Sequence, residues 1–210
     1  MALLELTNLS KSFGGLKAVR EVSFNVDASQ IVAVIGPNGA GKTTLFNLIS
    51  GHYPVDTGKV VFNGNDLTAL KSYQRTYLGM ARTFQNLALF KQLSTLDNVM
   101  VGMHSRTQAG LVGSLARTTS VKAEEKRARE RARELLEFVG LGDKEAALAK
   151  NLSYGMQKRL EIARALAAEP KLLLLDEPAA GLNPQDIPDL IKMIEKILAE
   201  GICVLLIEHK

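Results

Sequence analysis

Residues 36–44, "GPNGAGKTT", combine glycines, a lysine and two threonines in the spacing of a phosphate-binding loop. The glycines let backbone N–H groups turn toward phosphate oxygens, and a helix starting at Lys42 adds the positive end of its dipole. The Lys42 ammonium can reach the β- and γ-phosphates, and the Thr43 hydroxyl can bind Mg²⁺. We therefore predict a nucleotide site formed by Gly36, Pro37, Asn38, Gly39, Ala40, Gly41, Lys42, Thr43 and Thr44.

Residues 172–177, "LLLLDE", place two carboxylates directly after an apolar run. Four leucines would bury a strand and bring Asp176 to its exposed end, where α/β proteins bind ligands. Asp176 can then hold Mg²⁺ opposite Thr43, and Glu177 can act on the attacking water as a general base. On these residues alone, a pair of solvated carboxylates at a strand end remains an alternative.

Three further residues are weaker candidates when each is taken singly. Gln85 could reach metal or water, His209 could touch the γ-phosphate, and Phe13 could stack on adenine. Each also has an ordinary interpretation, as a loop amide, an incidental histidine and a core aromatic respectively.

A second helix start with anion-binding residue types lies at residues 152–159, "LSYGMQKR". Ser153 and Gly155 there are suited to meet an anion at the helix N-terminus. Ser153 is equally suited to be an ordinary N-cap, and the two interpretations do not exclude each other.

The elements that must position these residues alternate between strands and helices. Strands are expected at 3–9, 21–27, 30–36, 58–62, 78–85, 172–176 and 202–208, and helices at 42–50, 95–104, 122–139 and 185–199. The near-continuous apolar run at 30–36 indicates a strand buried on both faces. Alternation of this kind predicts an α/β fold with a mostly parallel core sheet, and we expect an antiparallel β edge on that sheet.

The stretch from about 86 to 169 is mainly helical and interrupts the alternation, so we expect a helical lobe there and the core sheet at about 1–85 and 170–210. Within it, residues 105–120 have no clear period and indicate a loop with short helical pieces. Glu125 with Arg129, and Arg133 with Glu137, are spaced as i,i+4 ion pairs on a solvated helix face.

Composition is compatible with one globular domain: 210 residues, 46% hydrophobic, with a formal net charge of +4. This mild excess is ordinary solvated surface and does not predict nucleic-acid binding. The single Cys203 has no internal disulfide partner, which fits a reducing compartment. The start "MALLELTNLSKSF" lacks a signal peptide pattern, and no apolar run approaches the length of a transmembrane helix.

The order of these motifs resembles the nucleotide-binding subunit of ABC transporters, a subgroup of P-loop NTPases. Phe13, the loop at 36–44, Gln85, "LSYGM", "LLLLDE", "AGLN" at 180–183 and His209 follow one another as in that family. The segments "RTFQNLALF" and "DEPAAGLNPQ" are most similar to the ATPases of branched-chain amino acid importers. Urea or amide importers and lipopolysaccharide exporters are the alternatives within the family.

The resemblance implies an ATPase that uses ATP and Mg²⁺. It implies Glu177 as general base, with Lys42, Gln85 and His209 as further catalytic residues, and a metal held by Thr43, Gln85 and Asp176. Phe13 would bind adenine. The nucleotide would also contact Ser153 and Gly155 of a second ATPase subunit, identical or different.

Further partners implied by the resemblance are transmembrane permease subunits and, indirectly, a periplasmic or extracellular solute-binding protein. The expected location is peripheral, on the cytoplasmic face of the plasma membrane. No nucleic-acid partner is implied.

The chain departs from the family pattern at several positions. "LSYGM" stands where the consensus is LSGGQ, so that Tyr154 and Met156 replace a glycine and a glutamine, and Asn183 stands where many relatives have aspartate. Members of the family continue beyond His209, so we expect the printed chain to be C-terminally truncated relative to them.

Rival classes predict features that this sequence does not show. A soluble ABC ATPase acting on ribosomes or DNA would carry two ATPase modules or a long coiled-coil insertion. An unrelated P-loop kinase or GTPase would lack "LSYG" and would show a nucleoside pocket or a guanine-specifying N-K-x-D, and N-K-x-D is absent. A non-hydrolysing dimer partner would lack some of Lys42, Asp176 and Glu177.

Overall fold

The computed structural model describes residues 2–103 and 119–208, in two compact units. The core unit comprises Met1–Gln85, Lys171–Ala180 and Ile187–Lys210, and the helical unit comprises Asn86–Pro170 and Gly181–Asp186. The chain therefore leaves the core unit after Gln85 and again after Ala180, in both cases a few residues beyond a strand end.

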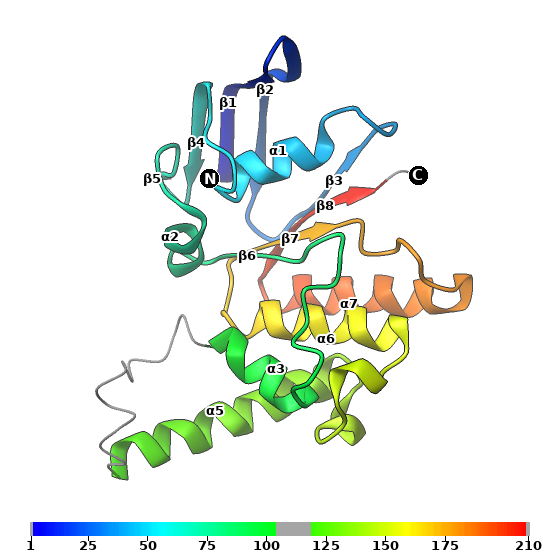
Figure 1. The fold of residues 1–210 in the computed structure, drawn as a ribbon. Helices are drawn as coiled ribbons and strands as arrows, with labels where there is room; N and C mark the ends of the chain where they lie inside the picture. Colours follow the sequence, from blue (N-terminus) through cyan, green and yellow to red (C-terminus); the bar gives the residue numbers. More distant parts are fainter. Residues whose placement is uncertain (1, 104–118, 209–210) are drawn as a thin grey trace. The chain divides into compact units, whose positions relative to one another are not determined.

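The core unit contains two four-stranded sheets (Figure 1). The first has the order β3 (Ile31–Ile35), β8 (Cys203–Glu208), β7 (Leu172–Asp176) and β6 (Met80–Arg82), with all neighbours parallel. The second has the order β2 (Leu16–Asp27), β1 (Ala2–Phe13), β4 (Thr57–Phe62) and β5 (Asn65–Asp66), with all neighbours antiparallel. The expected α/β fold is confirmed, and the antiparallel strands form a sheet of their own.

The prediction that residues 30–36 form a strand buried on both faces is wrong. β3 is the last strand in its sheet, so that within the described residues only β8 pairs with it. Ile31 is 40% exposed and Ile35 is 63% exposed. Ile31, Ala33 and Ile35 lie on one face of β3 and all are exposed, so that face is not covered within the described residues. An apolar run alone does not show what covers each face of a strand.

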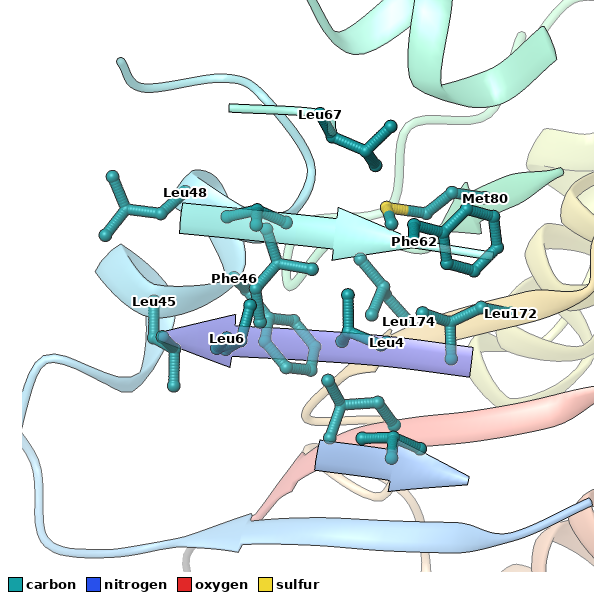
Figure 2. Close-up of a cluster of buried hydrophobic side chains, with 14 of the residues drawn as sticks. Leu4, Leu6, Leu45, Phe46, Leu48, Phe62, Leu67, Met80, Leu172 and Leu174 are labelled. Carbon is teal, nitrogen blue, oxygen red and sulfur yellow. The ribbon is translucent and has the colours of Figure 1, made fainter. Parts of the chain in front are cut away.

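Three helices belong to the core unit: α1 (Lys42–Ile49), α2 (Ser72–Tyr77) and α7 (Ile187–Ala199). One hydrophobic cluster joins α1 to both sheets, and Figure 2 shows Phe46 of α1 beside leucines of β1 and β7. Phe46, Leu4 and Leu174 are completely buried in it. The helix α1 starts at the phosphate-binding loop formed by residues 36–44, which is called the P-loop below. The packing of α1 therefore holds the P-loop against the end of the parallel sheet.

The helical unit is built from α3 (Thr95–Gly102), α5 (Thr119–Phe138) and α6 (Tyr154–Leu166), with 3-10 turns at Gly142–Lys144, Ala149–Asn151 and Pro184–Asp186. α3 packs on both α5 and α6. The fully buried Asn98 of α3 stabilises the preceding loop, because its side chain accepts from the Phe90 N–H and donates to the Phe90 carbonyl.

The outcome for the expected ion pairs on α5 is mixed. Arg129 and Glu125 form the i,i+4 pair at 3.0 Å, as predicted. The pairing of Arg133 with Glu137 is wrong, because Arg133 instead reaches Glu145 beyond the helix end at 2.8 Å. Most of the segment 105–120, for which we expected a loop, lies outside the described residues.

Candidate nucleotide-binding site

The P-loop has the backbone conformation that its glycines predict. Gly39 and Gly41 have φ values of 80° and 85°, in the left-handed region that favours glycine. Gly41 is the N-cap of α1, and a Cβ at this position would overlap the Ala18 carbonyl oxygen. The Ala40 N–H donates to the Pro37 carbonyl at 3.2 Å, which closes the loop on itself.

Lys42 is the first residue of α1, and its side chain folds back over the loop. Its Nζ donates to the Gly36 carbonyl at 2.6 Å and to the Pro37 carbonyl at 2.9 Å, and the residue is only 7% exposed. The ammonium is thus fixed at the place where a phosphate bound by the loop would need a positive charge.

Glu177 follows β7 in a strained backbone conformation, with φ of 49°. Its N–H donates to the Ile207 carbonyl of β8 at 3.1 Å, and its carboxylate accepts from Gln85 Nε2 at 3.2 Å. Two of the predicted site residues, 92 positions apart in the chain, are therefore in direct contact.

Asp176, the last residue of β7, is 1% exposed and paired with Arg82 of β6 at 2.7 Å. The pair uses only Oδ2. Within the described part of the chain, Asp176 Oδ1 has no hydrogen-bond partner although it is buried. A buried carboxylate oxygen without a partner is costly, and therefore marks a place where a ligand or water can bind. Sequence reasoning did not identify Arg82, although the motif "RTFQ" contained it.

One cavity of about 780 Å³ brings most of the predicted residues together. It is lined by Phe13, Asn38, Gly39, Ala40, Gly41, Lys42, Thr43, Thr44, Gln85 and Glu177, together with Leu16, Lys17 and Ala18. The last three residues were not predicted, because nothing in their types signals a site. They reach the cavity because the start of β2 lies beside the P-loop.

Phe13 stands at this cavity with an exposed ring. It is 43% exposed and makes an edge contact with Tyr53 at 5.3 Å between ring centroids, and Lys11 Nζ lies 5.6 Å from its ring. The alternative that Phe13 is an ordinary core aromatic does not match this exposure, whereas a flat exposed ring is suited to stack on a base.

The far end of α1 is held by a buried arginine. Arg75 of α2 is 2% exposed and donates from Nη1 to the carbonyls of Leu48 at 2.8 Å and Ile49 at 2.6 Å. A cation at a helix C-terminus is favourable because it satisfies the last carbonyls and the negative end of the dipole. Burial lowers the pKa of Arg75 to about 10.

Ser153 and Gly155 belong to the helical unit, at the start of α6. The Ser153 hydroxyl accepts from the Met156 N–H at 3.4 Å, which makes it the N-cap. Gly155 has room for a Cβ at ordinary contact distance, the nearest atom being Asp186 Oδ2 at 3.4 Å. His209 lies outside the described residues.

A P-loop follows the parallel strand β3, and the buried Asp176 and Glu177 lie at the end of β7, which is separated from β3 by β8. This arrangement defines the class of protein as a P-loop nucleotide-binding ATPase. Comparison with known proteins gives the family: the model of the ABC transporter family matches residues 19–180. The chain belongs to the ABC transporter family and is its ATPase domain, a type of domain that binds ATP and ADP.

Individual relatives agree with this assignment. BraF of Pseudomonas aeruginosa, a high-affinity branched-chain amino acid transport ATP-binding protein, is 41% identical over 99% of this chain and 82% of BraF. The ADP conformation of MJ1267, an ATP-binding cassette of an ABC transporter, has a TM-score of 0.86 at 35% identity, covering 100% of this chain and 82% of that one. The dimeric structure of MJ0796, a bacterial ABC transporter cassette, has a TM-score of 0.82 at 25% identity, covering 99% and 88%.

Among the described residues, no helix has both the length and the apolar character needed to cross a membrane.

Proposed function

We propose that this chain is the ATP-hydrolysing motor subunit of an ABC importer for branched-chain amino acids. The observation that carries the proposal is that the P-loop, Gln85 and Glu177 all line one cavity. The similarity to BraF, which acts in branched-chain amino acid transport, supports the class of solute.

Each residue has a role that follows from its position. The P-loop amides and Lys42 hold the phosphates, and Phe13 stacks on the adenine. Glu177 takes a proton from the attacking water, and Gln85, already hydrogen-bonded to Glu177, orients that water. Most of the rate enhancement comes from positioning and fixed charge. His209 remains a proposed contact of the γ-phosphate.

The residues near the P-loop fit a Mg²⁺ ion, which prefers hard oxygen ligands and keeps part of its water shell. Thr43 offers a hydroxyl, Gln85 an amide oxygen, and Asp176 the buried Oδ1 that lacks a partner in the described structure. When bound, the ion would neutralise charge that develops on the phosphates.

The second helix start supports a dimer. With one P-loop and one α6 start, the chain would complete its site through a second ATPase subunit, homologous or identical, whose Ser153 and Gly155 counterparts meet the γ-phosphate. Closing and reopening of this dimer would drive the movement of permease subunits. A solute-binding protein outside the cell would deliver the solute to them. The chain would therefore lie peripherally on the cytoplasmic face of the membrane, without a nucleic-acid partner.

The test is purification of the tagged chain, expressed from its own locus, from gently solubilised membranes, followed by mass spectrometry. We expect a polytopic membrane protein and a second ATPase, and we expect uptake of labelled leucine to fall in cells that carry Lys42→Ala. Recovery of ribosomes or DNA-repair proteins would contradict the transport role. A permease whose loss affects urea uptake or lipopolysaccharide export would contradict the solute.

A further inference from the structure

The described structure contains a buried arginine at the site to which no role has been assigned. Arg82 ends β6, two residues before Phe84 and three before Gln85, and its side chain is only 6% exposed. Burial of a guanidinium is expensive and is offset by the partners of its N–H groups. In Arg82, Nη1 and Nη2 have partners, whereas Nε is buried without one among the described residues. The partners of Arg82 therefore indicate what the residue does.

Arg82 joins two elements that must cooperate at the nucleotide. Its Nη2 donates to Asp176 Oδ2 at 2.7 Å, at the end of β7. Its Nη1 donates to Asn47 Oδ1 in the last turn of α1 at 2.7 Å and to Oγ of Ser50, the C-cap residue of α1, at 2.8 Å; α1 is the helix that starts at the P-loop. One planar group thus ties the metal-binding carboxylate to the phosphate-binding helix.

Two aromatic rings also restrict the orientation of the Arg82 guanidinium. Its Cζ lies 5.6 Å from the ring centroid of Phe46 and 5.1 Å from that of Phe84. These aromatic contacts favour a cation and restrict its plane. Arg82 is placed next to Asp176 by the parallel pairing of β6 with β7, in which it stands opposite Leu174.

The contact of Arg82 with Asp176 involves one of the two carboxylate oxygens. Arg82 engages Oδ2 only, and Oδ1 is buried without a partner among the described residues. A guanidinium that bound both oxygens would occupy a lone pair on each, whereas here both lone pairs of Oδ1 stay available to another ligand. The observed geometry fixes the carboxylate and leaves one oxygen available.

We propose that Arg82 is the positioning residue for Asp176, holding the carboxylate so that its Oδ1 serves Mg²⁺ and coupling it to the P-loop helix through Asn47 and Ser50. The inference rests on the proposed function, because it presumes that the chain binds ATP with Mg²⁺. Groups that orient metal ligands in this way typically change metal affinity by about 10–100-fold when they are removed.

The decisive variant is Arg82→Lys, because it keeps the charge beside Asp176 and removes the planar fork. A lysine ammonium cannot donate to Asp176 and to the two α1 side chains in the same geometry. The double variant Asn47→Ala, Ser50→Ala keeps Arg82 and its ion pair but removes the link to α1. Lys59→Met is the control, because it breaks an exposed ion pair with Asp66 in the same unit.

The measurement is binding of a fluorescent ATP analogue, first without metal and then during a Mg²⁺ titration, with the melting temperature of each variant recorded. For Arg82→Lys we expect unchanged metal-free affinity and a half-saturating Mg²⁺ concentration raised about tenfold. The double variant should shift in the same direction by a smaller factor, and Lys59→Met should match the wild type.

The outcomes separate the two proposals. An unchanged Mg²⁺ half-saturation in a folded Arg82→Lys protein overturns the role of Arg82 and leaves the ATPase assignment intact. If Arg82→Lys does not fold, the double variant decides in the same way. A wild-type chain that binds no nucleotide overturns the proposed function and this inference together.

Discussion

Tyr154 lies directly against Gly181, within the helical unit. A Cβ placed on Gly181 would stand 3.0 Å from Tyr154 Cε1 and 3.3 Å from Cζ, closer than side chains normally pack. Lys158 Nζ lies 5.9 Å from the same ring. Tyr154 at the start of α6 thus has a structural partner in the Gly181–Asp186 segment of the same unit.

Gly181→Ala should destabilise the protein by about 3 kcal/mol, the sum of a left-handed alanine and an overpacked contact. Gly201→Ala is the matched control. Its φ of 81° resembles the 75° of Gly181, but a Cβ there would meet nothing within 4 Å. It should therefore cost only about 1 kcal/mol. Urea unfolding measures both, and equal losses would show that the Tyr154 contact is unimportant.

Two P-loop glycines should separate folding from nucleotide binding. Gly41→Ala places a methyl group on the Ala18 carbonyl, so it should lower the melting temperature and abolish binding. Gly39→Ala meets no atom within 4 Å, and its methyl group would point into space at the cavity that Gly39 lines.

Gly39→Ala should therefore fold, losing about 1–2 kcal/mol to backbone strain, and bind ATP about tenfold more weakly. Thermal melting and titration with a fluorescent ATP analogue measure the two effects. If Gly39→Ala bound the ATP analogue with wild-type affinity, the phosphates of the nucleotide would not lie against Gly39.

Glu177→Gln should lower ATP turnover by about 10²–10⁴-fold while ATP binding persists, because the amide cannot take a proton from water. Glu208→Gln is a suitable control: Glu208 also ends a strand of the parallel sheet, where it accepts from the Ala179 N–H at 3.0 Å, and an amide oxygen can replace it. Phosphate release checks both variants. If Glu177→Gln hydrolysed ATP at the wild-type rate, Glu177 would not be the general base of the reaction.

His52 should make stability fall as the pH drops below neutral. Partial desolvation, with Arg82 and Arg75 nearby, lowers the pKa of His52 below its usual 6.5. The unfolded chain therefore takes up a proton more readily, so this contribution is complete above pH 6.5 and is lost as pH falls through the lower, folded value. His52→Gln should show a smaller decrease in melting temperature between pH 7 and pH 5. If the melting temperatures of the wild type and His52→Gln fall equally between pH 7 and pH 5, His52 does not cause the loss of stability.

The chemistry of the P-loop could be predicted from the sequence because it depends on local spacing. Gly39, Gly41 and Lys42 act through a backbone conformation that their own types define, and the leucines before Asp176 indicate its strand directly. The contact between Gln85 and Glu177 could be expected only from family resemblance, since it depends on the order of strands in the sheet.

What the sequence could not predict are the relationships set by tertiary structure. Arg82 looks like one charged residue among 26 lysines and arginines until the parallel pairing of β6 with β7 brings it to Asp176. Residues 30–36 were expected to be buried on both faces, yet the face of β3 that carries Ile31 and Ile35 is exposed. Arg133 was expected to pair along its helix, but a turn beyond the helix brings Glu145 closer.

The edge position of β3 also affects how this chain behaves at high concentration. Among the described strands it has a neighbour on one side only, so its other side presents backbone donors and acceptors next to the exposed Ile31 and Ile35. Such an edge is a template for intermolecular strand addition. At high concentration, the strand that delivers the P-loop is thus also a place where a strand of a second copy could pair, unless another segment covers this edge.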